Sequence, residues 1–203
     1  LGGAKIDTKL ELINQFLEKA DNIIIGGGMA FTFLRAKGKS IGGSLLDKSM
    51  INIAKSIMNN AISKGTKLIL PIDAVCASSL KDKNDKKTYP IDDIPSKMMG
   101  LDIGPDSVTR FNEFLGNSET ILWNGPMGVF ESKAYENGTR EMAIHLVSCV
   151  ASGAKVIVGG GDTAAALEKF GLMKDMTHVS TGGGASLELL SGNTLPALNA
   201  LEK

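Results

Sequence analysis

The chain of 203 residues has few of the features that mark several common protein classes. It carries only two cysteines, Cys76 and Cys149, which lie far apart without a partner motif. This usage argues against a disulfide scaffold and suits a reducing compartment. No apolar run reaches the length that a membrane-spanning helix needs, and no signal peptide is visible. We therefore expect a cytoplasmic protein with no membrane partner.

An excess of charge of either sign is also lacking. Lysine and arginine together number 22, as do aspartate and glutamate, so bulk electrostatics give no reason to expect a nucleic-acid partner. The two histidines, His145 and His178, are isolated from each other, which makes a zinc site unexpected. Nothing in the sequence suggests oligomerisation, so we expect a monomer.

Two common nucleotide-binding motifs are absent or incomplete. Gly38-Lys39-Ser40 imitates the end of a Walker A loop, but Phe33 stands where its first glycine belongs. Residues 159–164 satisfy the loose dinucleotide pattern GxGxxG/A. The acidic residue that this pattern requires about twenty positions later is missing, which argues against NAD. No serine or cysteine has a histidine and an acid at a spacing that suggests a nucleophilic site.

The chain is organised around residues 155–167, KVIVGGGDTAAAL. A β-branched run predicts a buried strand at residues 156–158, three glycines form a turn, and a strong helix begins near Ala164. Free N–H groups at a helix N-terminus favour phosphate, and glycines let a ligand come close. Asp162 would repel phosphate unless a cation lay between them, and Mg²⁺ is the simplest such cation. A tight turn with a helix cap and no ligand remains the structural alternative.

The same arrangement recurs along the chain. A predicted strand at residues 22–25 leads into glycines 26–28, and residues 178–181 lead into glycines 182–184. Because the carboxyl ends of parallel strands lie at one edge of a sheet, we expect all three turns to face one crevice. Lys5 and Lys9 lie four residues apart beside a further glycine turn, so both could reach one anion; two solvated lysines are the alternative.

Alternating strands and helices predict one α/β domain over residues 1–203, a doubly wound parallel sheet with helices on both faces in a Rossmann-like three-layer sandwich. The predicted helices are residues 9–20, 29–35, 48–63, 106–115, 135–152 and 185–190; further strands are 67–70 and 120–123. Residues 78–95, rich in lysine and aspartate, are expected to form an exposed hairpin or long loop. Asp73, just after a strand, is a candidate polar group at a ligand cleft. Glu131 could accept hydrogen bonds from two ribose hydroxyls.

Taken together, five stretches resemble the phosphoglycerate kinase family. They are residues 2–5 (GGAK), 24–31 (IIGGGMAF), 123–131 (WNGPMGVFE), 159–163 (GGGDT) and 178–188 (HVSTGGGASLE). They occur in the family's order and cover the chain from end to end. The part that they resemble is the C-terminal, nucleotide-binding domain of that two-domain kinase.

The resemblance implies reversible phosphoryl transfer between 1,3-bisphosphoglycerate and ADP, with Mg²⁺ as the cofactor. It implies that Lys5 and Lys9 hold the nucleotide phosphates, that Asp162 ligates Mg²⁺ and that Thr163 contacts phosphate. Lys5, Gly183 and Gly184 would act on the phosphoryl group in flight. The implied nucleotide-binding residues are Gly3, Ala4, Lys5, Lys9, Gly27, Gly28, Leu45, Gly100, Leu101, Asn124, Pro126, Val129, Glu131, Gly160, Gly161, Asp162 and Thr163.

Two departures from the family pattern affect these expectations. Many members carry aspartate at the position of Thr8, whereas here Asp7 stands one place earlier. The resemblance also implies an N-terminal domain for phosphoglycerate that these residues do not contain, so we expect the chain to be a fragment and inactive alone. The competing hypothesis is a non-catalytic module that binds a nucleotide or a phosphometabolite for regulation.

Overall fold

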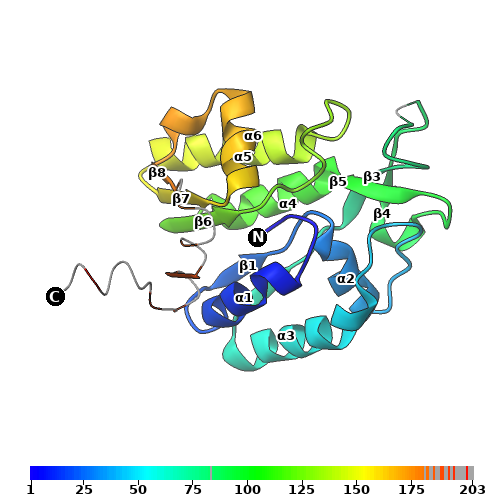
Figure 1. The fold of residues 1–203 in the computed structure, drawn as a ribbon, viewed down its shortest axis with the longest axis horizontal. Helices are drawn as coiled ribbons and strands as arrows, with labels where there is room; N and C mark the ends of the chain where they lie inside the picture. Colours follow the sequence, from blue (N-terminus) through cyan, green and yellow to red (C-terminus); the bar gives the residue numbers. More distant parts are fainter. Residues whose placement is uncertain are drawn as a thin grey trace.

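The computed structural model describes residues 1–82 and 84–180, together with residues 182, 185, 188, 189, 192, 194 and 200. Strands and helices alternate along most of this part of the chain, and helices cover both sides of the parallel strands (Figure 1). The predicted α/β class is therefore confirmed. The helix expected at residues 185–190 lies largely outside the described residues. In the described part of the chain, no helix is both long and apolar enough to cross a membrane.

The first half of the chain builds the lower layers of Figure 1 around two strands. Strand β1 (Asn22–Ile24) pairs in parallel with β2 (Lys67–Ile69). The helices around them are α1 (Leu10–Phe16), α2 (Met29–Ala36) and α3 (Ile51–Lys64). Ile23 and Ile25 face one hydrophobic core while Ile24 faces the other, as the twofold periodicity of a strand requires. Strand β1 is thus buried on both faces, which explains its unbroken apolar sequence.

The second half builds the upper layers around a three-stranded parallel sheet in the order β6–β7–β8. Ile121, Trp123, Val156 and Val158 alternate along its strands and pack into the second core. The elements of this half are β6 (Thr120–Asn124), β7 (Lys155–Gly159), β8 (His178–Val179), α4 (Pro105–Leu115), α5 (Asn137–Ala151) and α6 (Gly161–Phe170).

A third sheet, which the sequence did not predict, is antiparallel. Strand β3 (Asp73–Ala77) pairs with β4 (Lys87–Pro90) on one side and with β5 (Met99–Ile103) on the other. The pair β3–β4 is a hairpin, but its first strand lies before residues 78–95, so the range expected to form an exposed hairpin or long loop contains only the polar loop and β4. The described strands therefore fall into three sheets, although the sequence predicted one parallel sheet.

Helix boundaries differ from the predictions at both ends of several segments. Short 3₁₀ turns occur where α-helix was expected at residues 9 and 48–50, because the first turn of a helix can tighten in this way. The four 3₁₀ turns of the described residues are η1 (Asp7–Lys9), η2 (Lys48–Met50), η3 (Ile91–Asp93) and η4 (Met173–Asp175).

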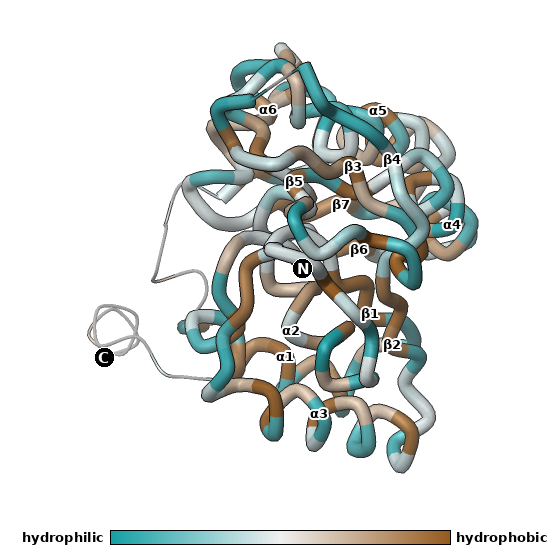
Figure 2. Tube along the Cα trace, turned by 90° about the vertical axis from the view of Figure 1, so that its right-hand side faces the viewer, coloured by the Kyte–Doolittle hydropathy of each residue, from teal (hydrophilic) through white to brown (hydrophobic). Residues whose placement is uncertain are grey.

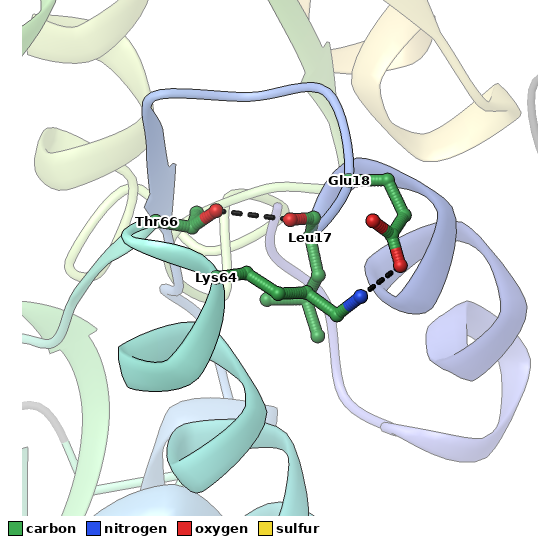
Figure 3. A network of polar contacts seen from close by, with 4 residues as sticks. All are labelled: Leu17, Glu18, Lys64 and Thr66. Atoms are coloured by element: carbon green, nitrogen blue, oxygen red, sulfur yellow. Dashed lines mark hydrogen bonds and ion pairs between the residues drawn. The ribbon is translucent and has the colours of Figure 1, made fainter.

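Helix α1 ends four residues earlier than predicted, and Lys64 at the end of α3 and Thr66 just before β2 contact residues at its C-terminus (Figure 3). The Thr66 hydroxyl donates a hydrogen bond of 3.0 Å to the Leu17 carbonyl oxygen, one of the carbonyls that a helix end leaves without an internal partner. The Lys64 ammonium pairs with the Glu18 carboxylate beside it. These contacts fix α1 against the start of β2.

Candidate functional site

The turns that follow β1 and β6, the start of α6 and the amino-terminal residues converge on one cavity of about 340 Å³. Eleven of the residues predicted from the sequence to bind nucleotide line it. These are Gly3, Ala4, Gly27, Gly28, Leu45, Gly100, Leu101, Pro126, Val129, Glu131 and Asp162. Of the two triple-glycine turns that the structure describes, the first lines the cavity through Gly27 and Gly28, whereas the turn at residues 159–161 does not line it and is followed by Asp162, which does. The third turn contains Gly183 and Gly184, which lie outside the described residues.

Backbone contacts hold the turns together at the cavity. The Gly3 amide donates to the Pro126 carbonyl oxygen at 2.8 Å, and the Gly27 amide donates to the Met127 carbonyl oxygen at 3.1 Å. Gly27 has a φ of +64°, and a Cβ atom there would lie 2.5 Å from the Gly3 nitrogen. Only glycine allows both this conformation and this close approach. The glycines of the sequence motif thus bring three chain segments into contact.

Lys9 and Asn124 do not line the cavity themselves, but they form a buried contact with each other. The Lys9 ammonium is buried and donates a hydrogen bond to the Asn124 side-chain oxygen. Burial lowers the pKa of Lys9, and the Asp162 carboxylate acts in the opposite direction. The Asn124 side-chain nitrogen is buried and has no hydrogen-bond partner among the described residues. Lys9 is therefore not one of two solvated lysines, and Lys5, which is exposed, does not line the cavity.

The turn between β7 and α6 lies next to Asn124. Gly160 has a φ of +92°, and a Cβ atom there would approach the Asn124 nitrogen at 3.0 Å. A Cβ atom at Gly161 would meet open space, and Asp162 is exposed, with no hydrogen bond or ion pair to any described residue. Thr163 is buried, and its hydroxyl oxygen accepts a hydrogen bond of 2.6 Å from the Gly125 amide. The hydroxyl hydrogen of Thr163 remains available as a donor.

Several residues of the cavity wall were missed by sequence reasoning because their neighbours come from distant parts of the chain. Phe31 lines the cavity and packs against Gly100, so one wall carries an aromatic ring. Asp102 is almost fully buried, and its carboxylate accepts hydrogen bonds from the Ile103 amide (2.9 Å) and the Gly138 amide (2.7 Å). Burial raises the pKa of Asp102 to about 7, against the effect of these two donors.

The loop from β6 to α5 is held by side chains that carried no sequence signal. Thr139 accepts hydrogen bonds from the Met127 amide (3.0 Å) and the Gly128 amide (3.2 Å). From α6, the Lys169 ammonium donates to the Phe130 carbonyl oxygen and pairs with the Glu136 carboxylate, both at 2.6 Å. These contacts fix the segment that carries Val129 and Glu131 relative to Asp162.

Asp73 does not supply a free carboxylate to this cleft, although it belongs to the cavity wall. Its carboxylate accepts hydrogen bonds from the Asp106 and Ser107 amides at 3.1 and 2.7 Å and so caps α4. Gly104, at the N-cap position of α4, has no side chain with which to do this. A residue of strand β3 thus caps α4, whereas a helix is usually capped by the residue at its own N-cap position.

The site combines glycine backbones, a buried cation, an exposed carboxylate at a helix N-terminus and an amide donor that no described residue pairs with. This combination suits a phosphorylated ligand, because amide N–H groups and lysine bind phosphate oxygens. Among the described residues, no group of three or more histidine, cysteine, aspartate or glutamate residues could hold a metal ion. Fold and site define a doubly wound α/β domain with glycine turns at the ends of its parallel strands.

Comparison with known proteins then identifies the family. The family model described as phosphoglycerate kinase matches residues 1–193, and the chain belongs to that family. Relatives named phosphoglycerate kinase from Synechococcus elongatus and Thermosipho africanus are each 48% identical to this chain and match essentially all of it. A relative from Arabidopsis thaliana named phosphoglycerate kinase 3, cytosolic, is 47% identical. The chain spans about half the length of these relatives.

Solved structures agree with this assignment. The structure of phosphoglycerate kinase from Coxiella burnetii is similar over 100% of this chain and 51% of that one, with a TM-score of 0.94 and 41% identity. Phosphoglycerate kinase from Pyrococcus horikoshii has a TM-score of 0.82 and 29% identity, over 99% of this chain and 50% of its own. The resemblance stated from the motifs is therefore confirmed.

Proposed function

We propose that this chain is the nucleotide-binding domain of a phosphoglycerate kinase. The enzyme transfers a phosphoryl group reversibly between 1,3-bisphosphoglycerate and MgADP, giving 3-phosphoglycerate and MgATP in glycolysis. The observation that carries the proposal is the buried Asn124 nitrogen, which has no hydrogen-bond partner in the described part of the chain and lies beside Lys9 and the Gly160 turn. An unpaired buried donor is costly, and a phosphate oxygen at this point would satisfy it.

The nucleotide base and ribose occupy the cavity that the glycine turns line. Leu45, Gly100 and Leu101 line the cavity and provide mostly apolar surfaces for the base. Glu131 accepts hydrogen bonds from the ribose hydroxyls, and its exposed carboxylate costs little to desolvate. Because Lys169 and Thr139 restrain the neighbouring backbone, Glu131 is held in position before the ligand arrives.

The phosphate groups lie towards Lys9, Asn124 and the N-terminus of α6. Lys9 and the amide donor of Asn124 neutralise and orient them, and Lys5, which is exposed, reaches the phosphoryl group from outside the cavity. Gly160 and Gly161 let the phosphates approach the backbone of the helix N-terminus. Gly183 and Gly184 direct further N–H groups at the phosphoryl group in transfer, as the family resemblance implies.

Mg²⁺ fits the residues present at this site. Asp162 has a carboxylate without a hydrogen-bond or ion-pair partner among the described residues, and Mg²⁺ prefers one or two carboxylates together with phosphate oxygens and water. When bound, the ion neutralises charge on the transferring phosphates. Asp162 supplies one ligand, in agreement with the absence of a larger ligand cluster among the described residues.

The phosphoglycerate end of the reaction belongs to a second domain outside these 203 residues. Closure of the two domains about a hinge brings the reactants together and excludes water. We further propose that the protein acts in the cytoplasm as a monomer. The name of the Arabidopsis relative, which includes the word cytosolic, supports that location.

Calorimetric titration with MgADP tests the proposed binding, and a mixture of this chain with a separately made N-terminal domain tests the reaction. We expect saturable binding of MgADP by the chain and phosphoryl transfer only in the mixture. Binding without transfer in a correctly assembled mixture would favour the regulatory module. No binding of MgADP by the folded chain would refute the proposed site.

A further inference from the structure

The loop of the β3–β4 hairpin lies outside the site described above. The structure describes residues 78–82 and 84–86 of this hairpin loop, which are mostly hydrophilic and lie on the side of the molecule that faces the viewer in Figure 2. The hairpin loop contacts the β6–α5 loop, residues 125–136, which carries Glu131. The two loops are far apart in the sequence, so only the tertiary structure brings them together.

Two hydrogen bonds join the hairpin loop to the β6–α5 loop. The Tyr135 hydroxyl donates to the Asp82 carbonyl oxygen at 2.7 Å, across 53 residues of sequence. The Lys86 ammonium donates to the Ala134 carbonyl oxygen at 3.2 Å. Because both acceptors are backbone oxygens, each bond restrains the course of a chain segment and not only the rotamer of a side chain.

The ring of Tyr135 lies behind the cavity wall. The residue is fully buried in a small hydrophobic cluster with Ala77 and Leu101, and Val129 packs against the same cluster. Leu101 and Val129 line the cavity, whereas Tyr135 does not. One side chain therefore links the wall of the cavity to the hairpin loop at the surface.

Backbone hydrogen bonds extend this restraint to Glu131. The Tyr135 amide donates to the Ser132 carbonyl oxygen at 2.9 Å, and the Ser132 amide donates to the Val129 carbonyl oxygen at 3.0 Å. The Val129 amide in turn donates to the Leu101 carbonyl oxygen at 2.8 Å. Glu131 lies within this series of turns and is exposed, so the position of its carboxylate depends on backbone contacts on both sides of it.

The surroundings of the Tyr135 hydroxyl suit it to a lasting role as a donor. Burial raises the pKa of Tyr135, and the Asp85 and Asp82 carboxylates act in the same direction, so the hydroxyl keeps its proton near neutral pH. A buried hydroxyl without a partner is costly, and the Asp82 carbonyl oxygen is its partner here. The Asp85 carboxylate also accepts a hydrogen bond of 3.0 Å from the Ser78 amide, which ties the two ends of the hairpin loop together.

We propose that Tyr135 and Lys86 are positioning residues for the ribose end of the nucleotide, and that they act through Val129 and Glu131. This inference rests on the proposed nucleotide site, in which Glu131 accepts hydrogen bonds from the ribose hydroxyls. Neither positioning residue lines the cavity. They hold the backbone of the β6–α5 loop, so that the Glu131 carboxylate meets both hydroxyls. Loss of either contact therefore weakens the interaction with ribose and leaves the phosphate end of the site unaffected.

The test compares MgADP with the Mg²⁺ complex of dideoxy-ADP, which lacks both ribose hydroxyls, by calorimetric titration. We expect the unaltered chain to bind MgADP at least about tenfold more tightly, because the hydrogen bonds to a carboxylate are lost with the hydroxyls. Glu131→Gln should reduce this ratio of the two dissociation constants most. Tyr135→Phe and Lys86→Met should each reduce the ratio by about threefold or more, with little change for dideoxy-ADP. A variant that is only less stable binds both ligands more weakly by the same factor, so the ratio separates positioning from stability.

The chain offers a matched control for each variant. Tyr89, its only other tyrosine, lies on β4 of the same hairpin and packs against the hydrophobic core around β1. Lys87 is exposed and stands next to Lys86 in the sequence. Tyr89→Phe and Lys87→Met should leave the ratio unchanged.

The outcomes distinguish this inference from the proposed function. An unchanged ratio in either Tyr135→Phe or Lys86→Met, or an equal fall in its control, would overturn the inference and leave the nucleotide site in place. Equal binding of the two ligands by the unaltered chain would also overturn it, because Glu131 would then have no ribose partner to be positioned for. Binding of neither ligand would refute the proposed function itself.

Discussion

At the scale of single residues, the site places three carboxylates in three different environments. Asp162 is exposed beside a helix N-terminus, Asp73 is buried and caps a helix, and Asp102 is buried in the cavity wall, where it accepts hydrogen bonds from backbone amides. The same functional group therefore serves three purposes, which only its surroundings distinguish. Each assignment predicts a different response to substitution.

Asp162→Asn should weaken binding of MgADP by at least about tenfold, which is ~1.4 kcal/mol. Binding of ADP without Mg²⁺ should change far less or improve, because the carboxylate repels bare phosphate. The physical reason is that the carboxylate helps to replace the water lost by the ion. Calorimetry with and without Mg²⁺ provides the comparison, and Asp106→Asn is the control. Equal losses in both conditions would contradict the metal role.

Gly161→Ala tests how closely a ligand approaches the turn. A Cβ atom there meets open space, and alanine favours helix by about 1 kcal/mol over glycine, so stability should be unchanged or higher. The added methyl group should nevertheless weaken MgADP binding, and Gly161→Val should weaken it further. Unfolding in urea and calorimetry measure the two effects separately. Unchanged affinity in the folded valine variant would show that phosphate does not approach this glycine.

The raised pKa of Asp102 predicts that the free energy of unfolding depends on pH. Its pKa is about 7 in the folded chain, above the value of about 3.8 expected when it is unfolded, so the folded state binds the proton more tightly. Protonation of Asp102 contributes fully to the free energy of unfolding below pH 4, and this contribution is lost as pH rises through 7. The free energy of unfolding changes by at most about 1.4 kcal/mol per pH unit through this group. Asp102→Asn should flatten the stability profile between pH 4 and 7 in urea unfolding. An unchanged slope would contradict this assignment.

At the scale of elements, the helices depend on groups that come from elsewhere in the chain. Helix α4 begins with glycine at its N-cap, and β3 supplies the missing acceptor through Asp73. At the C-terminus of α1, the hydroxyl of Thr66, which precedes β2, donates a hydrogen bond to the Leu17 carbonyl oxygen. The stability of each of these helices therefore depends on a side chain from another element. Mutating that side chain should destabilise the helix that it caps.

Asp73→Ala should lower the free energy of unfolding by about 1–3 kcal/mol, because it leaves the buried Ser107 amide without its acceptor and leaves the Ser107 hydroxyl only the backbone carbonyl oxygen of residue 73. Asp106→Ala changes an exposed carboxylate in the same turn and should cost less. Urea unfolding of both variants measures the difference. Equal stability of the Asp73 and Asp106 variants would contradict the prediction that the Asp73 cap stabilises α4.

At the scale of the whole molecule, this chain should bind MgADP and fail to transfer phosphoryl groups by itself. Phosphoryl transfer depends on holding both reactants in line, and positioning of the second reactant is worth roughly 7–11 kcal/mol of the barrier. A helix N-terminus alone contributes about 0.3–1 kcal/mol, which is far too little to replace it. A coupled assay of the isolated chain measures this directly. Turnover near that of a two-domain enzyme would contradict the prediction that a second domain must hold the other reactant.

The sequence by itself determined the α/β class, the order of the elements and most of the glycine turns. These features depend on local chemistry, such as the β-branched run before Gly159 and the left-handed Gly65 that ends α3. It also predicted eleven of the residues that line the cavity, because their motifs are local stretches that resemble one family.

Only the tertiary structure decided which partners meet across long distances in the chain. It brought Lys9 into contact with Asn124, Asp73 into contact with the N-terminus of α4, and Asp102 into contact with the Gly138 amide. These pairings could not be predicted from one sequence, because a buried polar group takes its partner from whatever element packs beside it. Burial and hydrogen bonding are properties of the folded arrangement, whereas periodicity and turn chemistry are properties of the chain.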